Sequence, residues 1–143
     1  MKKTFGLLGL LFVMMVCAFS AQAYDYEIYG KIGKYPVYME FDINSGRGQN
    51  VTVNGRYCYT QSGSGNYLYF KGTGRITGHL GGPTSVRGLQ YKLNFKEKNN
   101  KGQVTGTFNG TFVDGMGGDS LEGTFINFKG KRFTLRCSRS GAW

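Results

Sequence analysis

Val104-Thr-Gly-Thr-Phe-Asn-Gly-Thr-Phe112 alternates apolar residues and glycines with small polar residues. Residues two apart share one face of a β-strand, so the stretch predicts a strand with one apolar and one polar face. Its first half also follows a pattern, apolar–any–Gly–any–apolar, that occurs at five places. The copies are Ile28–Ile32, Val53–Tyr57, Ile76–Leu80, Val104–Phe108 and Leu121–Phe125. Glycine weakens a strand, so its repeated use indicates a geometric need, such as the tight curvature of a small barrel.

Alternation of this kind continues from residue 24 to the end of the chain, and no window of about 11 residues has helical periodicity. Short glycine-rich turns separate about nine strand-like runs. The runs are Tyr24–Ile32, Pro36–Ile43, Gln49–Gln61, Tyr67–Lys71, Arg75–Leu80, Leu89–Lys96, Val104–Phe112, Leu121–Lys129 and Phe133–Ser138. Gly72-Thr-Gly74 is interpreted as a turn, and the longest connection, Gly81–Gly88, as a candidate binding loop.

The run Val104–Phe112 has two interpretations. Asn109-Gly110 is a strong signal for a two-residue hairpin. The alternation nevertheless passes through this dipeptide without a break, and a hairpin would leave two arms of only about five residues. We therefore favour one continuous strand.

The turns decide the fold class. Short turns make sequence neighbours antiparallel neighbours, so the chain is expected to meander. A long meander has to hide its edges, and closure does so best. We predict an all-β fold, an antiparallel up-and-down meander that closes into a barrel of about eight strands, with an interior that is filled or holds one small ligand. A two-sheet sandwich is the alternative.

The first 23 residues have the order of regions found in a signal peptide. Lys2 and Lys3 precede an apolar run from Phe5 to Phe19, and Ala21-Gln-Ala23 is a small-x-small cleavage site. The apolar run is short for a membrane-spanning helix. We expect cleavage after Ala23, which leaves a single domain, residues 24–143, in the periplasm or outside the cell, without a transmembrane segment.

The chain is strongly basic, with a net charge of +10. Cleavage removes two lysines and leaves 16 basic and eight acidic side chains, a net charge of +8. For an exported protein this charge favours a small anionic or envelope ligand, or an acidic protein face, and not nucleic acid. A basic surface that only aids solubility is the plainer interpretation.

Two cysteines remain after cleavage, Cys58 and Cys137. An even count in an oxidising compartment predicts one disulfide between them. Alternation opposes this prediction, because Cys137 shares the face of the apolar residues of its strand whereas Cys58 lies opposite them. A bulge near Gly55, or a last strand outside the barrel, would remove the conflict; two buried free thiols are the other outcome.

Groups that perform catalysis are scarce. His79 is the one histidine of the chain, and nothing marks a nucleophile beside it. One histidine and two cysteines do not make a zinc site. We expect no enzyme activity, no metal and no cofactor.

The ten tyrosines, all after residue 23, are the strongest indication of a binding surface, because tyrosine offers a ring and a hydroxyl at low entropic cost. Tyr57 and Tyr59 share a face with apolar positions, so they are expected to line the interior. With Tyr91, and with Arg87 in the long connection, they are the candidate ligand-binding residues. Strand propensity alone also explains many tyrosines.

A second candidate surface lies at the C-terminal end of the chain. Lys129, Lys131, Arg132, Arg136 and Arg139 place five positive charges on one hairpin and the strand after it. We interpret them as an anion-binding or partner-binding rim, or as charges that protect a sheet edge.

Two resemblances bear on these expectations. Tyr29-Gly-Lys-Ile-Gly-Lys-Tyr-Pro-Val-Tyr-Met-Glu-Phe41 and Val53-Asn-Gly-Arg-Tyr-Cys-Tyr59 resemble small exported bacterial proteins of uncharacterised function. Thr105-Gly-Thr-Phe108 and Glu122-Gly-Thr-Phe125 are similar to the Gly-Thr-aromatic strands of avidin-like and lipocalin-like barrels. The second resemblance implies a ligand-binding barrel, although the one tryptophan, Trp143, does not match the several that avidins place around biotin.

Two functions follow as hypotheses. The first is an exported, non-enzymatic barrel that binds a ligand in its mouth. The second is an envelope-associated interaction or inhibitor protein that engages an acidic partner through its basic surface. A cavity lined by tyrosines favours the first, and a filled core with a contiguous outer patch favours the second.

Overall fold

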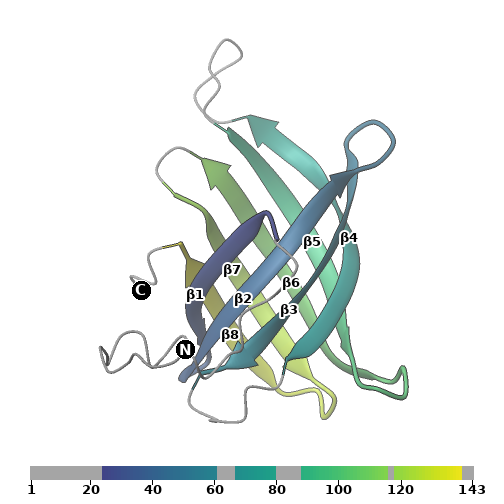
Figure 1. Cartoon of the computed structure of the whole chain (residues 1–143), viewed down its shortest axis with the longest axis vertical. Helices are drawn as coiled ribbons and strands as arrows, with labels where there is room; N and C mark the ends of the chain where they lie inside the picture. Colours follow the sequence, from purple (N-terminus) through teal and green to yellow (C-terminus); the bar gives the residue numbers. More distant parts are fainter. Residues whose placement is uncertain (1–23, 61–66, 80–87, 116–117, 140–143) are drawn as a thin grey trace, which may run out of the picture.

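The computed structural model describes residues 24–60, 67–79, 88–115 and 118–139, and these residues form eight strands and no helix (Figure 1). The strands are β1 (Tyr26–Ile32), β2 (Tyr35–Ser45), β3 (Asn50–Tyr59), β4 (Leu68–His79), β5 (Gly88–Lys98), β6 (Val104–Gly115), β7 (Ser120–Asn127) and β8 (Arg132–Ser138). None of the described residues belongs to a helix long and apolar enough to cross a membrane.

The eight strands form one closed barrel in chain order, which confirms the predicted fold class. Every strand is antiparallel to the next, and β1 closes the barrel by pairing with β8. This closing seam is short, because only Tyr29–Ile32 and Leu135–Ser138 face each other across it. β5 and β6, in contrast, are paired along the whole of β5. The predicted edge at the last strand therefore does not exist.

β4 is the element for which the prediction from sequence is wrong. Gly72-Thr-Gly74 is not a turn but the middle of one strand, paired with β3 on one side and β5 on the other. The reason is visible in the alternation, because Phe70, both glycines and Ile76 continue one inward face. β6 keeps its predicted continuity, and Asn109 and Gly110 pair with β5 and β7 as ordinary strand residues.

Aromatic side chains fill the middle of the barrel. Phe70, Phe95, Phe108 and Phe112 are almost completely buried. The ring centroids of Phe70 and Phe95 lie 4.4 Å apart, and those of Phe95 and Phe108 lie 4.8 Å apart. The centre of the barrel is therefore a packed core and not a channel.

In most copies of the repeat, but not in every copy, the glycine allows a close approach of neighbouring strands or side chains. A Cβ atom on Gly30 would overlap the carbonyl oxygen of Arg136 across the closing seam. A Cβ atom on Gly123 would likewise overlap the backbone of β6. At Gly78, where the register of β4 and β5 shifts, a Cβ atom would have no neighbour within 4 Å.

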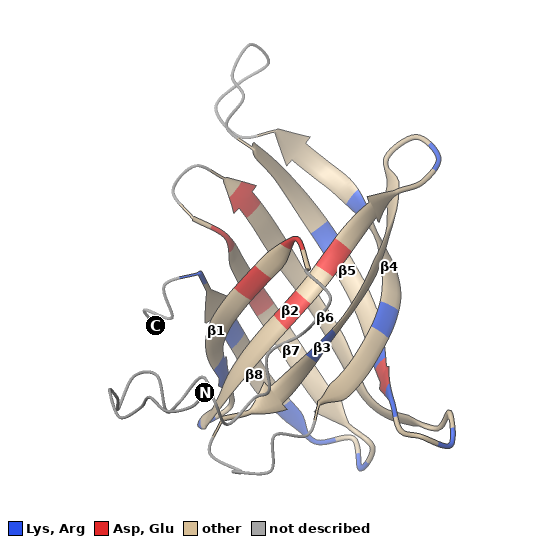
Figure 2. Cartoon of the chain, in the orientation of Figure 1, with Lys and Arg blue, Asp and Glu red and all other residues tan. Residues whose placement is uncertain are grey.

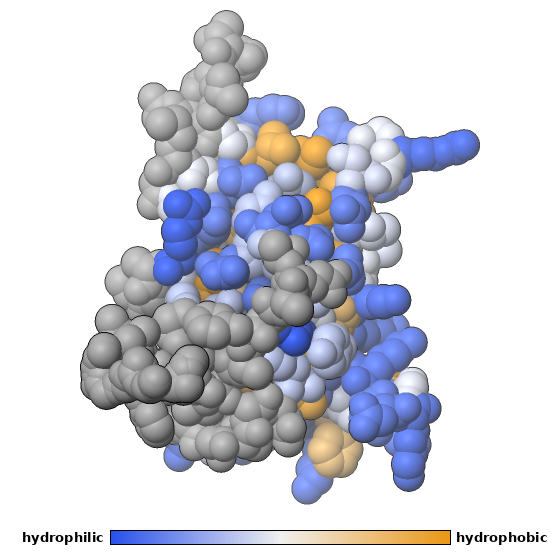
Figure 3. Space-filling model, in the orientation of Figure 1, coloured by the Kyte–Doolittle hydropathy of each residue, from blue (hydrophilic) through white to orange (hydrophobic). Residues whose placement is uncertain are grey.

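The outward faces of the strands are mostly polar. The described surface in Figure 3 is accordingly hydrophilic over most of its area, with hydrophobic residues gathered toward the upper end of the barrel. This is the expected pattern of a barrel whose apolar residues alternate inward.

Candidate functional site: the lower mouth of the barrel

An open pocket of about 630 Å³ lies at one end of the barrel. We call this end the lower mouth; it carries the β1–β2, β5–β6 and β7–β8 hairpins, at the bottom of Figure 1. Its lining residues come from the ends of the strands: Ile32, Tyr35, Pro36, Tyr57, Tyr59, Leu68, Glu97, Thr105, Phe125, Asn127, Phe128 and Phe133. The packed core of the barrel lies above the pocket in the orientation of Figure 1 and forms its inner end.

A buried carboxylate forms the polar part of the floor. Glu97 is only 5 % exposed. The Tyr57 hydroxyl donates a 2.5 Å hydrogen bond to its Oε1 atom, and the Thr105 hydroxyl donates one of 2.5 Å to its Oε2 atom. Both carboxylate oxygens therefore have a neutral donor, and among the described residues no ion pair involves Glu97. This arrangement satisfies the carboxylate without a neighbouring cation.

The electrostatics keep Tyr57 a hydrogen-bond donor. Burial raises the pKa of its hydroxyl far above the ordinary value, and the negative charge of Glu97 raises that pKa further. Burial also raises the pKa of Tyr59. Both phenols are consequently protonated at physiological pH, and the floor keeps its hydrogen bonds.

Aromatic rings make the walls. The ring centroids of Tyr57 and Tyr59 are 5.5 Å apart, and those of Tyr35 and Tyr59 are 6.2 Å apart, both with nearly perpendicular planes. On the opposite wall the rings of Phe125 and Phe133 are 6.2 Å apart. A wall of this kind offers a large apolar area to a ligand, with the tyrosine hydroxyls as its few polar groups.

Two hairpins with the same hydrogen-bond pattern form part of the rim. Asn127-Phe-Lys-Gly-Lys131 joins β7 to β8, and Asn99-Asn-Lys-Gly-Gln103 joins β5 to β6. In each, the side-chain oxygen of the first Asn accepts hydrogen bonds from the amides two and four residues later, at 2.9–3.0 Å. The glycine of each hairpin has a positive φ, 79° at Gly102 and 83° at Gly130. The turns are therefore well defined, and each presents lysine at the mouth.

Three lysines of the rim stand over rings that border the pocket. The Nζ atom of Lys34 is 5.6 Å from the centroid of Tyr35, and that of Lys131 is 5.4 Å from the centroid of Phe133. Lys129 stands 5.7 Å from the ring of Phe128, which is itself 73 % exposed. These distances are those of cation–π contacts, so the positive charges are held beside the entrance.

The structure divides the four predicted ligand-binding residues. Tyr57 and Tyr59 line the pocket together, as expected. Tyr91 lies toward the other end of the barrel, where its ring stacks on Phe112 with the centroids 6.1 Å apart. Arg87 lies outside the described residues. Among the three tyrosines that the structure describes, Tyr91 is not part of the pocket that Tyr57 and Tyr59 line.

The five predicted basic residues do not form one surface. Lys129, Lys131 and Arg132 lie at the lower mouth. Arg136 occupies the outer face of β8, where it pairs in register with Glu122 of β7. Arg139 lies at the opposite end and forms a 3.2 Å ion pair with Asp119. Figure 2 shows lysine and arginine on the lower hairpins, on the β2–β3 hairpin and along β4 and β5, with most acidic residues higher on the barrel.

The expected disulfide between Cys58 and Cys137 is not formed: Cys137 is a buried free thiol. Cys137 belongs to the core inside the barrel, whereas Cys58 occupies an outward position of β3. The β2–β3 register is unbroken through Gly55, and β8 is a barrel strand, so neither proposed way of bringing the thiols to one side applies. Burial raises the pKa of the Cys137 thiol to about 12.

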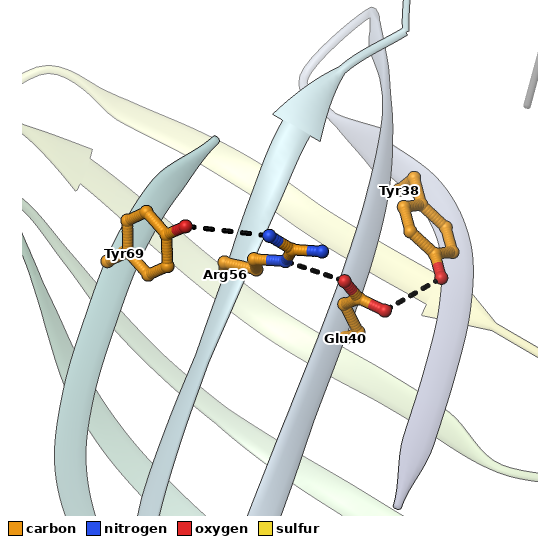
Figure 4. A network of polar contacts seen from close by, with 4 residues as sticks. All are labelled: Tyr38, Glu40, Arg56 and Tyr69. Atoms are coloured by element: carbon orange, nitrogen blue, oxygen red, sulfur yellow. Dashed lines mark hydrogen bonds and ion pairs between the residues drawn. The ribbon is translucent and has the colours of Figure 1, made fainter. Parts of the chain in front are cut away.

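A second polar cluster lies on the outside of the barrel wall (Figure 4). The Arg56 Nε atom donates a 2.6 Å hydrogen bond to Glu40, the Tyr38 hydroxyl donates one of 3.0 Å to the same carboxylate, and a 3.5 Å bond links Arg56 to Tyr69. Glu40 is only 2 % exposed although it faces outward. The cluster ties β2, β3 and β4 together, and we assign it to the stability of the wall.

A larger hollow of about 890 Å³ lies on the outer wall across β3 to β7. Outward-facing polar side chains such as Thr52, Arg75, Asn94 and Glu122 line it. A ligand over this hollow would have to replace the hydration of these polar side chains, whereas the walls of the smaller pocket are mostly aromatic. The smaller aromatic pocket is therefore the better candidate site.

Glu97 and Thr105 are among the functional candidates that the sequence interpretation missed, as are the wall residues Tyr35, Phe125 and Phe133. A signal for Glu97 is present, because the inward series Leu89, Tyr91, Leu93 and Phe95 reaches it at the next step. The predicted strand ends at Lys96, whereas β5 continues for two more residues, to Lys98. For Thr105 no signal is evident, because by alternation it belongs to the polar face of β6.

Comparisons with protein-family models, with curated proteins and with solved structures gave no match to this chain. The resemblance to small exported bacterial proteins and to avidin-like or lipocalin-like barrels stays a prediction. Among the residues that the structure describes, no group of three or more His, Cys, Asp or Glu side chains is placed to hold a metal ion.

Proposed function

We propose that this protein is an exported, non-enzymatic binding protein that takes one small, largely apolar molecule into the lower mouth of its barrel. The observation that carries the proposal is the aromatic pocket of about 630 Å³, whose inner end is formed by the packed core of the barrel. Its volume lies in the range of small-molecule sites, and apolar walls with few polar groups are typical of such sites. Tyr57 and Tyr59, both expected in such a site, belong to it.

The alternative function, an acidic protein partner bound by a basic surface, has less support. The basic residues proposed for it are spread over the lower mouth, the outer wall and the far end of the barrel. Arg139 is already engaged by Asp119. The prediction of export depends on residues 1–23, which lie outside the described residues. The mass of the protein recovered from the periplasm or the medium would show whether the chain is cleaved after Ala23.

Binding of a neutral fluorescent probe tests the proposed function. N-phenyl-1-naphthylamine fluoresces in apolar sites, and we expect saturable binding of one molecule per chain. Leu68 lines the pocket, so Leu68→Trp should fill part of it and weaken binding at least about tenfold. The matched control is Leu89→Trp at the other end of the barrel, which should bind the probe like the parent protein.

The outcome that contradicts the proposal is clear. Absence of saturable probe binding by the parent protein would rule it out. Equal binding by Leu68→Trp and the parent, with both variants folded by circular dichroism, would place the probe elsewhere and would also rule it out.

A further inference from the structure

We infer that the ligand of the lower mouth is an amphipathic anion, bound with its apolar part inside the pocket and its acidic group at the lysine rim. The inference rests on the proposed function and adds the chemical class and the orientation of the ligand. Its basis is the juxtaposition of a buried carboxylate at the floor with lysines held at the entrance.

The rim is positive on three sides. Lys34 comes from the β1–β2 hairpin, Lys101 from the β5–β6 hairpin, and Lys129 and Lys131 from the β7–β8 hairpin. Among the described residues of these three hairpins there is no acidic side chain. An anion at the entrance therefore meets several positive charges and no carboxylate beside them.

The lysines of the rim are held in place by neighbouring groups, but among the described residues they form no ion pair. Lys34, Lys129 and Lys131 stand over rings that line the pocket, and among the described residues none of the three forms an ion pair. The Asn127 side chain holds the amides of both lysines of its hairpin. An acidic group at the entrance would thus pair with these ammonium groups without breaking an existing ion pair.

The floor sets the orientation. Glu97 places a carboxylate at the bottom of the pocket, with Tyr57 and Thr105 already donating to its two oxygens. A second negative charge beside it, away from water, is unfavourable. The acidic group of an anionic ligand is therefore directed outward, and its alkyl or aromatic part lies against Tyr59, Phe125 and Phe133.

A cationic amphiphile is the competing occupant, since its head group would pair with Glu97 inside the aromatic walls. The ring of lysines opposes it at the entrance, and the two existing donors leave Glu97 no unmet need for a cation. Charge complementarity at the entrance consequently favours the anion.

Displacement of the neutral probe by three ligands of one chain length tests the inference. Decanoate, 1-decanol and decyltrimethylammonium differ only in head group. We expect decanoate to bind about fivefold or more tightly than the alcohol in low salt, and the difference to shrink at about 0.5 M salt because exposed charges are screened. The ammonium compound should bind most weakly.

Variants assign the effect to the rim. Lys34→Gln, Lys129→Gln and Lys131→Gln combined should weaken decanoate about tenfold and leave the alcohol and the probe unchanged. Arg47→Gln, Arg75→Gln and Lys92→Gln combined remove the same charge away from the lower mouth and should leave decanoate binding close to that of the parent protein. Glu97→Gln should not weaken decanoate, because it removes a repulsive charge.

Each other outcome overturns the inference. If the probe binds but decanoate and the alcohol compete equally, the ligand class is wrong while the proposed function stands. An equal loss of decanoate affinity in both triple variants would mean that net charge, and not the lysines of the rim, determines binding. Tighter binding of decyltrimethylammonium that Glu97→Gln abolishes would reverse the orientation. Binding to anionic vesicles without binding to monomeric decanoate would show a membrane surface site instead.

Discussion

Gly30 shows how a single residue controls closure of the barrel. It lies in the seam between β1 and β8, where a Cβ atom would overlap the Arg136 carbonyl oxygen and crowd the Cα atom of Cys137. Backbone atoms cannot swing aside as a long side chain can. We expect Gly30→Ala to destabilise the fold by about 2 kcal/mol or more, at the upper part of the range for overpacking.

The same repeat supplies the control. Gly78 stands at the equivalent position of its copy, but a Cβ atom there meets nothing within 4 Å. Gly78→Ala should change the free energy of unfolding by less than about 0.5 kcal/mol, or increase it slightly because alanine restricts the unfolded chain. Urea unfolding of both variants measures the difference. Equal effects would show that the repeat does not reflect backbone approach.

At the scale of elements, the closing seam is the weakest pairing of the barrel. β1 and β8 face each other over four residues, Tyr29–Ile32 against Leu135–Ser138, whereas β5 and β6 pair along all of β5. Fewer cooperative pairs mean that the seam opens at a lower free energy than the rest of the sheet. We expect amide hydrogens bonded across the seam to exchange earlier than those between β5 and β6.

Native-state hydrogen exchange read by NMR or mass spectrometry tests this order. Gly30→Ala should accelerate exchange further in β1 and β8 and leave β5 and β6 close to their original rates under strongly native conditions. Exchange of the seam at the same rate as β5 and β6 would mean that the barrel opens only as a whole.

The strands could be predicted because inward and outward residues alternate, and the main error, the division of β4, arises where glycine is compatible with both a turn and a strand. Gly72-Thr-Gly74 has turn composition, yet it continues the inward face of Phe70 and Ile76 and is strand. Asn109-Gly110 has hairpin composition, but there the unbroken alternation predicts one continuous strand, and the structure confirms it. In both places pairing on two sides outweighs local turn propensity, and the unbroken alternation is the sequence signal of a continuous strand.

The site could be predicted only in part, for a related reason. Alternation places Tyr57, Tyr59 and Tyr91 on inward faces correctly, but it does not say toward which mouth each lies. That depends on strand register and tilt, which separate Tyr91 from the other two. Alternation did predict that Cys58 and Cys137 lie on opposite sides of the barrel wall. The structure agrees with alternation and not with the pairing that the even number of cysteines suggested.

At the scale of the whole molecule, burial of tyrosine links stability to pH. Burial is the largest cause that raises the pKa of Tyr57, Tyr26, Tyr38 and Tyr91, and neighbouring carboxylates raise these values further. In the unfolded chain a tyrosine titrates near its ordinary pKa of about 10. Above that pH the unfolded chain has lost protons that the folded barrel keeps, so the free energy of unfolding falls as pH rises.

This stabilisation is fully present below about pH 9 and is lost progressively above about pH 10. A fully buried tyrosine such as Tyr57, which is 1 % exposed, contributes a slope of up to about 1.4 kcal/mol per pH unit, and the partly buried Tyr26 and Tyr38 contribute less. Urea unfolding between pH 7.5 and 11.5 should show a plateau in the free energy of unfolding and then a steep decline.

Tyr57→Phe is expected to be less stable on the plateau, because Glu97 loses a donor. Its free energy of unfolding should decline less steeply with pH, by the slope that corresponds to about one proton. Tyrosinate absorbance of the folded protein should lag behind that of the unfolded chain over the same pH range. A decline that is equally steep in the parent and in Tyr57→Phe would show that Tyr57 titrates in the folded barrel, and that the floor of the lower mouth is more open to water than its burial indicates.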